Sequence, residues 1–373
     1  MQDQQKSSLA LFRAYPGLID TLGWIPLANL PTPVEPMRKL AEELDEEDLF
    51  IKRDDLSGDV YGGNKVRKLE FLLAEAQARE AIAVMTFGTA GSNHCLATAI
   101  YARKLGMEAI SILSPQANTS LVGPNLLMGY HVGAELHHYN SESTAERGAA
   151  WQTARRVGVG EPAPHLIRRG GSSPLGTIGF VNAGLELAEQ IRRGELPEPD
   201  LLYVALGTMG TAVGLSMGLA AAGLSTKVVA VRVVDLAYGS EAGFNKLFDS
   251  TAALLRKLDD NFPKLRWVDA NVDFRHDQFG EKYALYTEAG MEAVNLLKST
   301  EGIKLEGTYT GKAMAALIAD SLVGQLEGKA ILFWNTYNSR EFPAEAMERS
   351  YERLPFPVQT YFEKPFQPLD PKS

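Results

Sequence analysis

The stretch DLLYVALGTMGTAVGLSMGLAAAGLSTKVVAVRVV (residues 200–234) decides the fold class. Two short apolar runs, LLYVAL and KVVAVRVV, are typical of buried strands, and the segment between them has the length of a helix. A strand, a glycine-bearing turn, a helix and a second strand form a βαβ unit, whose two strands lie parallel. The sequence therefore predicts an α/β fold in which helices cover a parallel sheet.

The turn GTMGT (207–211) follows the first of these strands and opens the helix. Backbone N–H groups at such a helix start suit a phosphate group, while a tight turn without a ligand is the alternative. The glycine spacing is G-x-x-G-x-x-x-G rather than the dinucleotide-binding G-x-G-x-x-G, and GTYTGKA (307–313) lacks the spacing of a Walker loop. The turn by itself leaves both interpretations open.

Short apolar strands and helices alternate along most of the chain from residue 48 onward. A length of 373 residues allows two lobes with separate cores, so two parallel sheets are expected rather than one. The least regular part, residues 240–282, reads as a charged helical insertion. The proline-rich tail FPVQTYFEKPFQPLDPKS (356–373) predicts an extended arm without regular structure.

Composition and charge narrow the class of protein. Hydrophobic residues make up 45% and charged residues 22% of the chain, which is typical of a soluble globular protein. The formal net charge is −9, so neither nucleic acid nor a membrane surface is an expected partner. Cys95 is the single cysteine, which excludes an internal disulfide. With no apparent signal peptide or membrane span, this favours a cytoplasmic location.

Two further loops, GGNK (62–65) and GTAGSNH (88–94), share with GTMGT a position near the carboxyl end of a predicted strand. Ligands bind at these ends in open α/β sheets. Taken alone, Lys65 reads as a solvated lysine, and Ser92 or Asn93 reads as a helix cap. Taken together, a phosphate turn, an amide-bearing loop and a lysine between small residues are the parts that pyridoxal phosphate requires.

Other chemistries find less support in the sequence. His137 and His138 are neighbours on a predicted strand, so their side chains face opposite sides and cannot share a metal ion. The chain contains neither an H-E-x-x-H motif nor a G-x-S-x-G motif. Cys95 reads as a small core residue rather than a nucleophile. No metal site is therefore expected.

A family resemblance rests on motifs spread over most of residues 50–335: KRDDL (52–56), GGNKVRKLEFL (62–72), AGSNHCLATAIYARKLGM (90–107), GGSSPLGTIGFVNAGLEL (170–187), GTMGTAVGL (207–215) and TYTGKAM (308–314). With these motifs the chain resembles the fold-type II pyridoxal phosphate enzymes of the 1-aminocyclopropane-1-carboxylate (ACC) deaminase and D-cysteine desulfhydrase group. The resemblance implies a tryptophan synthase β-like fold, with two open, twisted, mainly parallel sheets flanked by helices.

The same resemblance implies a domain organisation. A large domain that binds pyridoxal phosphate would comprise residues 1–67 plus 171–373, and a small domain would comprise residues 68–170. The active site would lie in the cleft between them, and the enzyme would be a homodimer.

The resemblance also assigns roles to individual residues, position by position. Lys65 would be the catalytic Schiff-base lysine, and Asn93 would donate a hydrogen bond to the 3′-oxygen of the cofactor. Thr310 would face the pyridine nitrogen. Ser92, Tyr283 and Tyr309 would be catalytic and would contact the substrate together with Asn93 and His94. The cofactor phosphate would be held by Gly207, Thr208, Met209, Gly210 and Thr211.

Thr310 also bears on the reaction. ACC deaminases carry a glutamate at this position, in Y-E-G-K, whereas this chain has Tyr309-Thr310-Gly311-Lys312, the desulfhydrase form. A hydroxyl opposite the pyridine nitrogen leaves the ring largely unprotonated, which suits β-elimination. The resemblance therefore implies conversion of D-cysteine to pyruvate, ammonia and hydrogen sulfide. ACC deamination and elimination from another β-substituted amino acid are the alternatives.

One segment departs from the family pattern. Where the family has a His-Thr-Gly-Gly type of sequence after its last strand, this chain has Trp334-Asn335-Thr336-Tyr337-Asn338. Tyr337 or Asn338 would either fill part of the pocket or force the loop elsewhere. This departure motivates a further alternative, a binding protein that keeps the fold without turnover.

Overall fold

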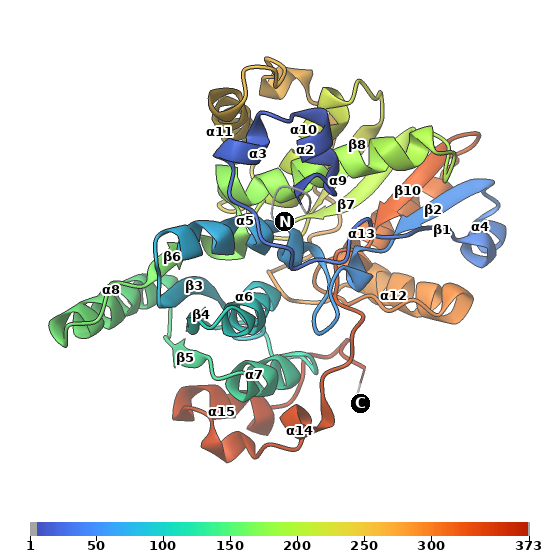
Figure 1. Cartoon of the computed structure of the whole chain (residues 1–373). Helices are drawn as coiled ribbons and strands as arrows, with labels where there is room; N and C mark the ends of the chain where they lie inside the picture. The colour runs from blue at the N-terminus through green and yellow to red at the C-terminus, as the bar shows by residue number, and fades with distance from the viewer. Residues whose placement is uncertain (1–5, 372–373) are drawn as a thin grey trace. The chain divides into compact units, whose positions relative to one another are not determined.

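The computed structural model describes residues 6–371 and divides them into two compact units. Unit 1 comprises residues 6–71 and 172–339, and unit 2 comprises residues 72–171 and 340–371. Figure 1 labels most of the helices and strands of both units. One boundary falls inside helix α5 (Asn64–Ala78), and another directly follows the 3-10 helix η2 (Arg169–Gly171).

Unit 1 is built on a six-stranded sheet in the order β1-β2-β10-β7-β8-β9. Its strands are β1 (Val34–Pro36), β2 (Asp48–Lys52), β7 (Leu201–Leu206), β8 (Lys227–Arg232), β9 (Val272–Arg275) and β10 (Ala330–Trp334). β1 pairs antiparallel with β2, and the other neighbouring strands run parallel. Strands β7 and β8 flank helix α10 (Gly210–Ala221) in sequence and are hydrogen-bonded neighbours, as the opening stretch predicts.

Helices cover both faces of this sheet, because successive residues of a strand point to opposite sides. Leu202, Val204 and Leu206 pack into one core, whereas Tyr203 and Ala205 pack into another. The first core also draws on α2 (Ala10–Ala14), α3 (Leu18–Thr21), α9 (Pro174–Arg192), α10 and α11 (Glu241–Leu258). The second draws on α4 (Arg38–Leu44), α12 (Glu288–Glu301) and α13 (Thr310–Leu322). Two short 3-10 helices, η1 (Asp54–Leu56) and η3 (Trp267–Asp269), complete the unit.

Unit 2 is built on a four-stranded parallel sheet in the order β5-β4-β3-β6. Its strands are β3 (Ala83–Thr89), β4 (Glu108–Ser114), β5 (Glu135–His138) and β6 (His165–Ile167). Its helices are α6 (Asn93–Lys104), α7 (Val122–His131), α8 (Glu142–Gly158), α14 (Ala344–Met347), η4 (Tyr351–Arg353) and α15 (Phe356–Glu363). Two mostly parallel sheets flanked by helices thus confirm the predicted fold class.

The C-terminal segment differs from the prediction in two respects. It was predicted as an extended arm, but Phe356–Glu363 forms helix α15. Pro355 occupies the N-cap and Pro357 lies in the first turn, where a missing N–H group leaves no bond unmade. The predicted domain boundaries placed this segment in the large domain, whereas residues 340–371 belong to unit 2.

The predicted insertion is part of the core of unit 1. Residues 241–258 form the expected helix α11, but the short edge strand β9 was not predicted. Phe244 of α11 packs edge-on against Phe274 of β9, with ring centroids 5.2 Å apart and an interplanar angle of 89°. The edge strand therefore extends the parallel sheet, and its Phe274 packs against helix α11.

Across residues 6–371, no helix combines the length and the apolar character that crossing a membrane requires.

Candidate active site

The two glycines before Lys65 are required by the close approach of other chain segments. A Cβ atom on Gly62 would lie 2.1 Å from the carbonyl oxygen of Asp55, and one on Gly63 would lie 2.7 Å from that of Thr336. Gly63 also has a φ of +86°, a conformation that favours glycine. Neither position tolerates a larger residue, so the chain is held tightly just before α5 begins.

Lys65 lies in the first turn of α5. The Asn64 backbone N–H donates to the Thr336 carbonyl oxygen (3.1 Å), and the Asn64 side-chain amide donates to the Thr211 hydroxyl (3.0 Å). These bonds tie the start of α5 to the start of α10. Desolvation lowers the pKa of Lys65 from 10.5 to about 8, because burial penalises the charged amine. At pH 7 an amine with this pKa is about one-tenth neutral, far more than an ordinary lysine, and the neutral form is the nucleophile.

The GTMGT turn is shaped for an anion. Met209 has a φ of +68° and occupies the N-cap of α10 without a side-chain hydrogen bond to the first turn. The Gly210 N–H lies 3.3 Å from the Ser172 hydroxyl, which in turn lies 2.8 Å from the Thr208 hydroxyl. Backbone N–H groups at a helix start, two hydroxyls and the positive end of the helix dipole are the groups that bind phosphate.

Lys68 was missed by the sequence analysis. Its ammonium group is buried, lies 3.2 Å from the Ser172 hydroxyl, and would lie 2.9 Å from a Cβ atom on Gly210. Burial, and then the neighbouring Lys65, hold the pKa of Lys68 well below its ordinary value. An anion bound at the turn would stabilise the charged form. The spacing of three residues from Lys65 was the available signal, since it places both lysines on one face of a helix.

Two tyrosines lie beside the same turn. The hydroxyl oxygens of Tyr283 and Tyr309 are 2.5 Å apart, and their rings meet edge to face with centroids 6.2 Å apart. A Cβ atom on Gly207 would lie 3.6 Å from the Tyr309 ring. The structure therefore brings both predicted tyrosines next to the predicted phosphate turn.

Glu306 is a second residue that the sequence analysis missed. Its buried carboxyl group accepts backbone N–H bonds from Thr308, Tyr309 and Thr310, at 2.8, 2.8 and 2.9 Å. Burial raises the pKa of Glu306, and these N–H groups partly oppose the rise. The Thr310 hydroxyl accepts the Glu306 backbone N–H at 3.0 Å. Glu306 thus fixes the start of α13, and an acidic residue shortly before a helix was the available signal.

The loop that departs from the family pattern stays beside the GGNK loop. The Asn338 side-chain oxygen accepts the Gly62 N–H at 2.7 Å, and the Asn335 side-chain oxygen accepts the Tyr337 N–H at 3.2 Å. The Tyr337 side chain is buried, with the Lys304 ammonium 5.5 Å from its ring centroid. Burial, and then Glu306, raise the pKa of Tyr337. The loop is therefore integrated into unit 1, and its asparagine helps to position the loop before Lys65.

In unit 2, Ser92 and Asn93 lie at the start of α6. The Ser92 hydroxyl accepts the Cys95 N–H at 3.2 Å, so Ser92 caps the helix. The side-chain amide of Asn125 donates to the Asn93 side-chain oxygen (3.1 Å) and to the Gly91 carbonyl oxygen (2.9 Å). Because the oxygen of Asn93 is engaged, its NH₂ group is the end that suits donation to a ligand oxygen.

His94 points into the sheet of unit 2. Its ring Nε2 lies 3.0 Å from the Thr86 hydroxyl, which donates to the Ile167 carbonyl oxygen, and the side chain is only 3% exposed. This environment gives no support to the substrate contact expected for His94.

Cys95 is likewise buried, and burial raises the pKa of its thiol to about 11. This agrees with the prediction of an unreactive core cysteine.

The groups of unit 1 fit pyridoxal phosphate. The neutral-prone amine of Lys65, the GTMGT turn, the buried ammonium of Lys68 and the Thr310 hydroxyl lie on neighbouring elements. They offer an amine for the aldehyde and an anion site for the phosphate. The Thr310 hydroxyl also lies 3.3 Å from a carboxylate oxygen of Glu306, and its role at the ring nitrogen stays a prediction. Ser92 and Asn93 belong to unit 2, and the expected cleft between domains stays a prediction.

Comparison with known proteins identifies the family. Residues 25–336 match the family model described as pyridoxal-phosphate dependent enzyme. The chain belongs to this family. Its cofactor is therefore pyridoxal phosphate, and the chain is an enzyme of the fold-type II class.

The relatives of this pyridoxal phosphate enzyme carry the names of two different activities. The chain is 34% identical over 290 residues to a protein of Pyrococcus furiosus provisionally named 1-aminocyclopropane-1-carboxylate deaminase, covering 78% of this chain and 84% of the relative. It is also 34% identical over 296 residues to the D-cysteine desulfhydrase of Salmonella schwarzengrund, covering 78% and 86%.

Solved structures agree on the fold of this pyridoxal phosphate enzyme. An ACC deaminase homologue superposes with a TM-score of 0.74 at 29% identity, covering 88% of this chain and 94% of the homologue. A fungal L-serine ammonia-lyase from Rhizomucor miehei superposes with a TM-score of 0.57 at 19% identity, covering 91% and 99%, and shows the fold alone.

Proposed function

We propose that this enzyme catalyses β-elimination from a small amino acid, with D-cysteine as the first candidate and pyruvate, ammonia and hydrogen sulfide as products. The proposal rests chiefly on Thr310, a hydroxyl residue at the start of α13 whose backbone is fixed by Glu306. The family resemblance places this residue at the pyridine nitrogen, where ACC deaminases carry a glutamate. ACC deamination is the alternative, because relatives of equal identity carry either name.

Bound pyridoxal phosphate supplies an electron sink that stabilises negative charge at the substrate Cα. The Lys65 amine, with its pKa of about 8, is the base that we propose takes the Cα proton. The Cβ–S bond then breaks with its electron pair on sulfur, and the sulfide leaves. Addition of water to the remaining three-carbon unit releases ammonia and gives pyruvate.

We assign the other residues by their chemistry. Backbone N–H groups of Gly207–Thr211, together with the Lys68 ammonium, hold the phosphate. The Asn93 amide donates to the cofactor 3′-oxygen, and the Ser92 hydroxyl binds the substrate carboxylate. The Tyr283–Tyr309 hydroxyl pair holds or relays a proton near the substrate, since a short hydrogen bond between two phenols allows either to be the donor.

The experiment is a parallel assay of the purified protein with D-cysteine, L-cysteine and ACC. Sulfide, ketoacid and the visible band of the bound cofactor are followed together. We expect sulfide and pyruvate from D-cysteine in equal amounts, and neither product from a Lys65→Ala variant. Ketoacid from ACC without sulfide from D-cysteine would favour the alternative, and a cofactor band that responds to neither compound would favour a non-catalytic binding protein.

A pair of variants at Thr310 sharpens the test. Thr310→Ser keeps a hydroxyl group and is expected to retain D-cysteine turnover. Thr310→Glu places a carboxylate opposite the ring nitrogen and is expected to lower D-cysteine turnover by about tenfold or more, because the ring would become protonated. Equal loss in both variants would show that the hydroxyl chemistry is not what selects the reaction.

We further propose that the enzyme works as a homodimer in the cytoplasm. The family resemblance supports the dimer, and the single cysteine is compatible with a reducing compartment. Light scattering on the purified protein tests the dimer, since it should report twice the chain mass of 40.7 kDa. Fractionation of the source cells tests the location.

A further inference from the structure

The C-terminal segment forms a structure outside the family match. The family model ends at residue 336, whereas residues 340–371 form α14, η4 and α15 in unit 2. Helix α15 lies against α7 and beside the carboxyl ends of β4 and β5, where ligands bind in parallel sheets. The family resemblance therefore says nothing about what this part of unit 2 does.

The loop after β4 fixes the end of α15. The Asn118 side-chain amide donates to the carbonyl oxygens of Tyr361 (3.1 Å) and Lys364 (2.8 Å), and the Gln367 N–H donates to the Asn118 carbonyl oxygen (3.0 Å). These bonds satisfy carbonyl groups that a helix end leaves without partners. The Ser120 N–H donates to the Asp370 carboxylate at 2.9 Å. The segment is thus tied to the loop after β4 at several points.

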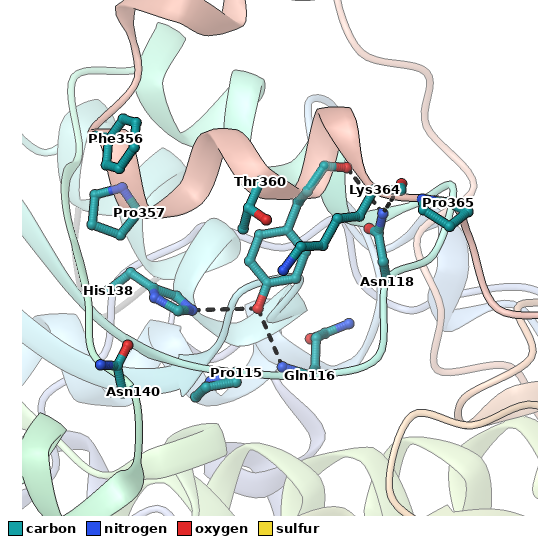
Figure 2. A pocket seen from close by; sticks show the side chains of 11 residues that line it. Pro115, Gln116, Asn118, His138, Asn140, Phe356, Pro357, Thr360, Lys364 and Pro365 are labelled. Atoms are coloured by element: carbon teal, nitrogen blue, oxygen red, sulfur yellow. Dashed lines mark hydrogen bonds between the residues drawn. The ribbon is translucent and has the colours of Figure 1, made fainter.

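A pocket with a volume of about 700 Å³ lies between this loop, the end of β5 and α15. Figure 2 shows its lining, with Gln116 and Asn118 from the loop, His138 from β5, and Phe356 and Thr360 from the helix. Its volume is within the range of sites that hold small organic molecules. None of the lining residues is among those proposed to bind the cofactor or the substrate.

The polar groups of this pocket suit an anion. None of the lining residues is acidic, and the Lys364 side chain extends over the pocket with its ammonium group inside the ring of lining residues (Figure 2). Pro115, Pro357 and Phe356 add apolar walls, and the Phe356 ring is 84% exposed. A site with one ammonium group, no acidic side chain and an exposed aromatic ring matches a negatively charged head on an apolar body.

The hydrogen bonds of the Tyr361 hydroxyl indicate which ring nitrogen of His138 carries the proton. The Tyr361 hydroxyl accepts the Gln116 N–H (3.3 Å), so its own proton is available to His138 Nε2 at 3.3 Å. Burial lowers the pKa of His138, which keeps the imidazole neutral with its proton on Nδ1. Neither His138 Nδ1 nor the Asn118 side-chain oxygen has a partner among the described residues. Both atoms are covered by protein, so they do not face the open pocket, and the proposal below does not use them.

We propose that this pocket is a second binding site, which takes a small organic carboxylate with an apolar body about the size of one ring. The Lys364 ammonium binds the carboxylate, and the ring of Phe356 covers the apolar body. The proposal goes beyond the elimination reaction and does not depend on it.

Gln116 connects this pocket to the loop before α6. Its backbone N–H contacts Tyr361 in the pocket wall, while its side-chain oxygen accepts the Gly91 N–H at 2.9 Å. Gly91 directly precedes Ser92. An occupant that restrains Gln116 therefore also restrains the Gly91 N–H. We expect amide hydrogen exchange in the peptide covering residues 89–95 to slow when the pocket is occupied.

The test uses the full chain loaded with cofactor and titrates 4-fluorobenzoate by ¹⁹F NMR, with 4-fluorobenzyl alcohol as the uncharged counterpart. We expect saturable binding of the benzoate and binding of the alcohol that is weaker by about tenfold. Lys364→Met should weaken benzoate binding by about the same factor and leave the alcohol unchanged, whereas Lys364→Arg should retain benzoate binding. Lys104→Met, at an exposed lysine of the same unit, is the matched control.

Several results would overturn the proposal. One is equal binding of benzoate by Lys364→Met and the unaltered protein; another is equal binding of benzoate and alcohol. A benzoate-induced shift of the cofactor band that persists in Lys364→Met would place the ligand at the cofactor instead. Should Lys364→Met fail to fold by circular dichroism, Thr360→Trp serves in its place, because a bulky ring fills the pocket and must abolish binding. These measurements read binding alone, so failure of D-cysteine turnover would not affect them.

Discussion

Lys65 shows what a single residue gains from its surroundings. In the sequence it is one of 37 lysine and arginine residues, and in the structure desolvation lowers its pKa to about 8. The cause is burial of the amine in the first turn of α5, where water cannot fully solvate the charged form. Its neighbours exclude water from the amine, and the lowered pKa follows from that.

This lowered pKa predicts how the protein takes up its cofactor. Only the neutral amine attacks an aldehyde, so the rate of pyridoxal phosphate uptake by the cofactor-free protein should rise with pH through a midpoint near 8. The growth of the visible band after mixing measures this rate, and Lys65→Ala should not form the band. A rate that rises only as pH approaches 10.5, the ordinary value for lysine, would contradict the assignment.

Adding a single methyl group at Gly62 is predicted to reduce stability and cofactor binding. A Cβ atom there would lie 2.1 Å from a backbone oxygen that cannot move aside, so Gly62→Ala should displace the loop before Lys65. We expect loss of stability by about 2 kcal/mol or more and weakened cofactor binding. Thermal unfolding and the cofactor band measure both.

The matched control for Gly62 is Gly158→Ala, at the end of α8, where an added Cβ meets no atom within 4 Å. This variant should change stability by no more than about 1 kcal/mol, because alanine only improves helix propensity there. Equal behaviour of the two variants would show that the close approach at Gly62 is not restrictive.

At the scale of elements, a buried ionic network fixes α5 in unit 1. The Arg67 guanidinium, two residues after Lys65, bonds to the carboxylates of Asp54 and Glu186, and Lys52 bonds to Glu186 as well. Arg67, Asp54 and Lys52 are 0% exposed, and Glu186 is 4% exposed. The network joins β2, η1, α5 and α9. It therefore fixes the orientation of α5, and with it the position of Lys65.

Removal of Arg67 should therefore be costly. Arg67→Leu leaves two buried carboxylates without their main partner, and we expect a loss of about 3–5 kcal/mol in the free energy of unfolding. Urea unfolding measures it. Arg79→Leu, which breaks the exposed ion pair with Glu75 just after the same helix, should cost less than about 1 kcal/mol. Similar losses in both variants would mean that the network does not hold α5.

At the scale of the whole molecule, the same network predicts sensitivity to acid. Burial by itself would raise the pKa of Glu186, but Arg67 and Lys52 outweigh burial and lower the pKa from 4.5 to about 2. A carboxylate whose pKa is lower in the folded state adds stability above pH 4.5, and this stability is lost as pH falls toward 2. The free energy of unfolding should therefore decline steeply over this range.

Urea unfolding at a series of pH values between about 6 and about 2.5 measures that decline. Glu186→Gln should reduce its slope, because the amide does not titrate, whereas Gln at the exposed Glu42 should leave the slope unchanged. An unaltered slope in Glu186→Gln would assign the acid sensitivity to other carboxyl groups.

Much of the molecule was predictable from local patterns. The alternation of apolar strands and helices predicts the α/β class, and residues 200–234 form the βαβ unit that their pattern indicates. The GGNK loop with Lys65 and the GTMGT turn could be singled out from the sequence, because glycines destabilise the interior of an ordinary strand or helix. The edge strand β9 and helix α15 were missed, because short segments with prolines or charges give weak local signals.

The sequence by itself determined the fold class and the family and predicted Lys65 as the reactive lysine, because periodicity and motif spacing are local and can be read without coordinates. Only the tertiary structure decided which distant residues meet. Glu306 bonds the backbone at Thr310, Lys68 reaches Ser172, and the tail closes a pocket on β4 and β5. These contacts join segments through burial and hydrogen bonding, whose energies depend on three-dimensional neighbours rather than on residue type.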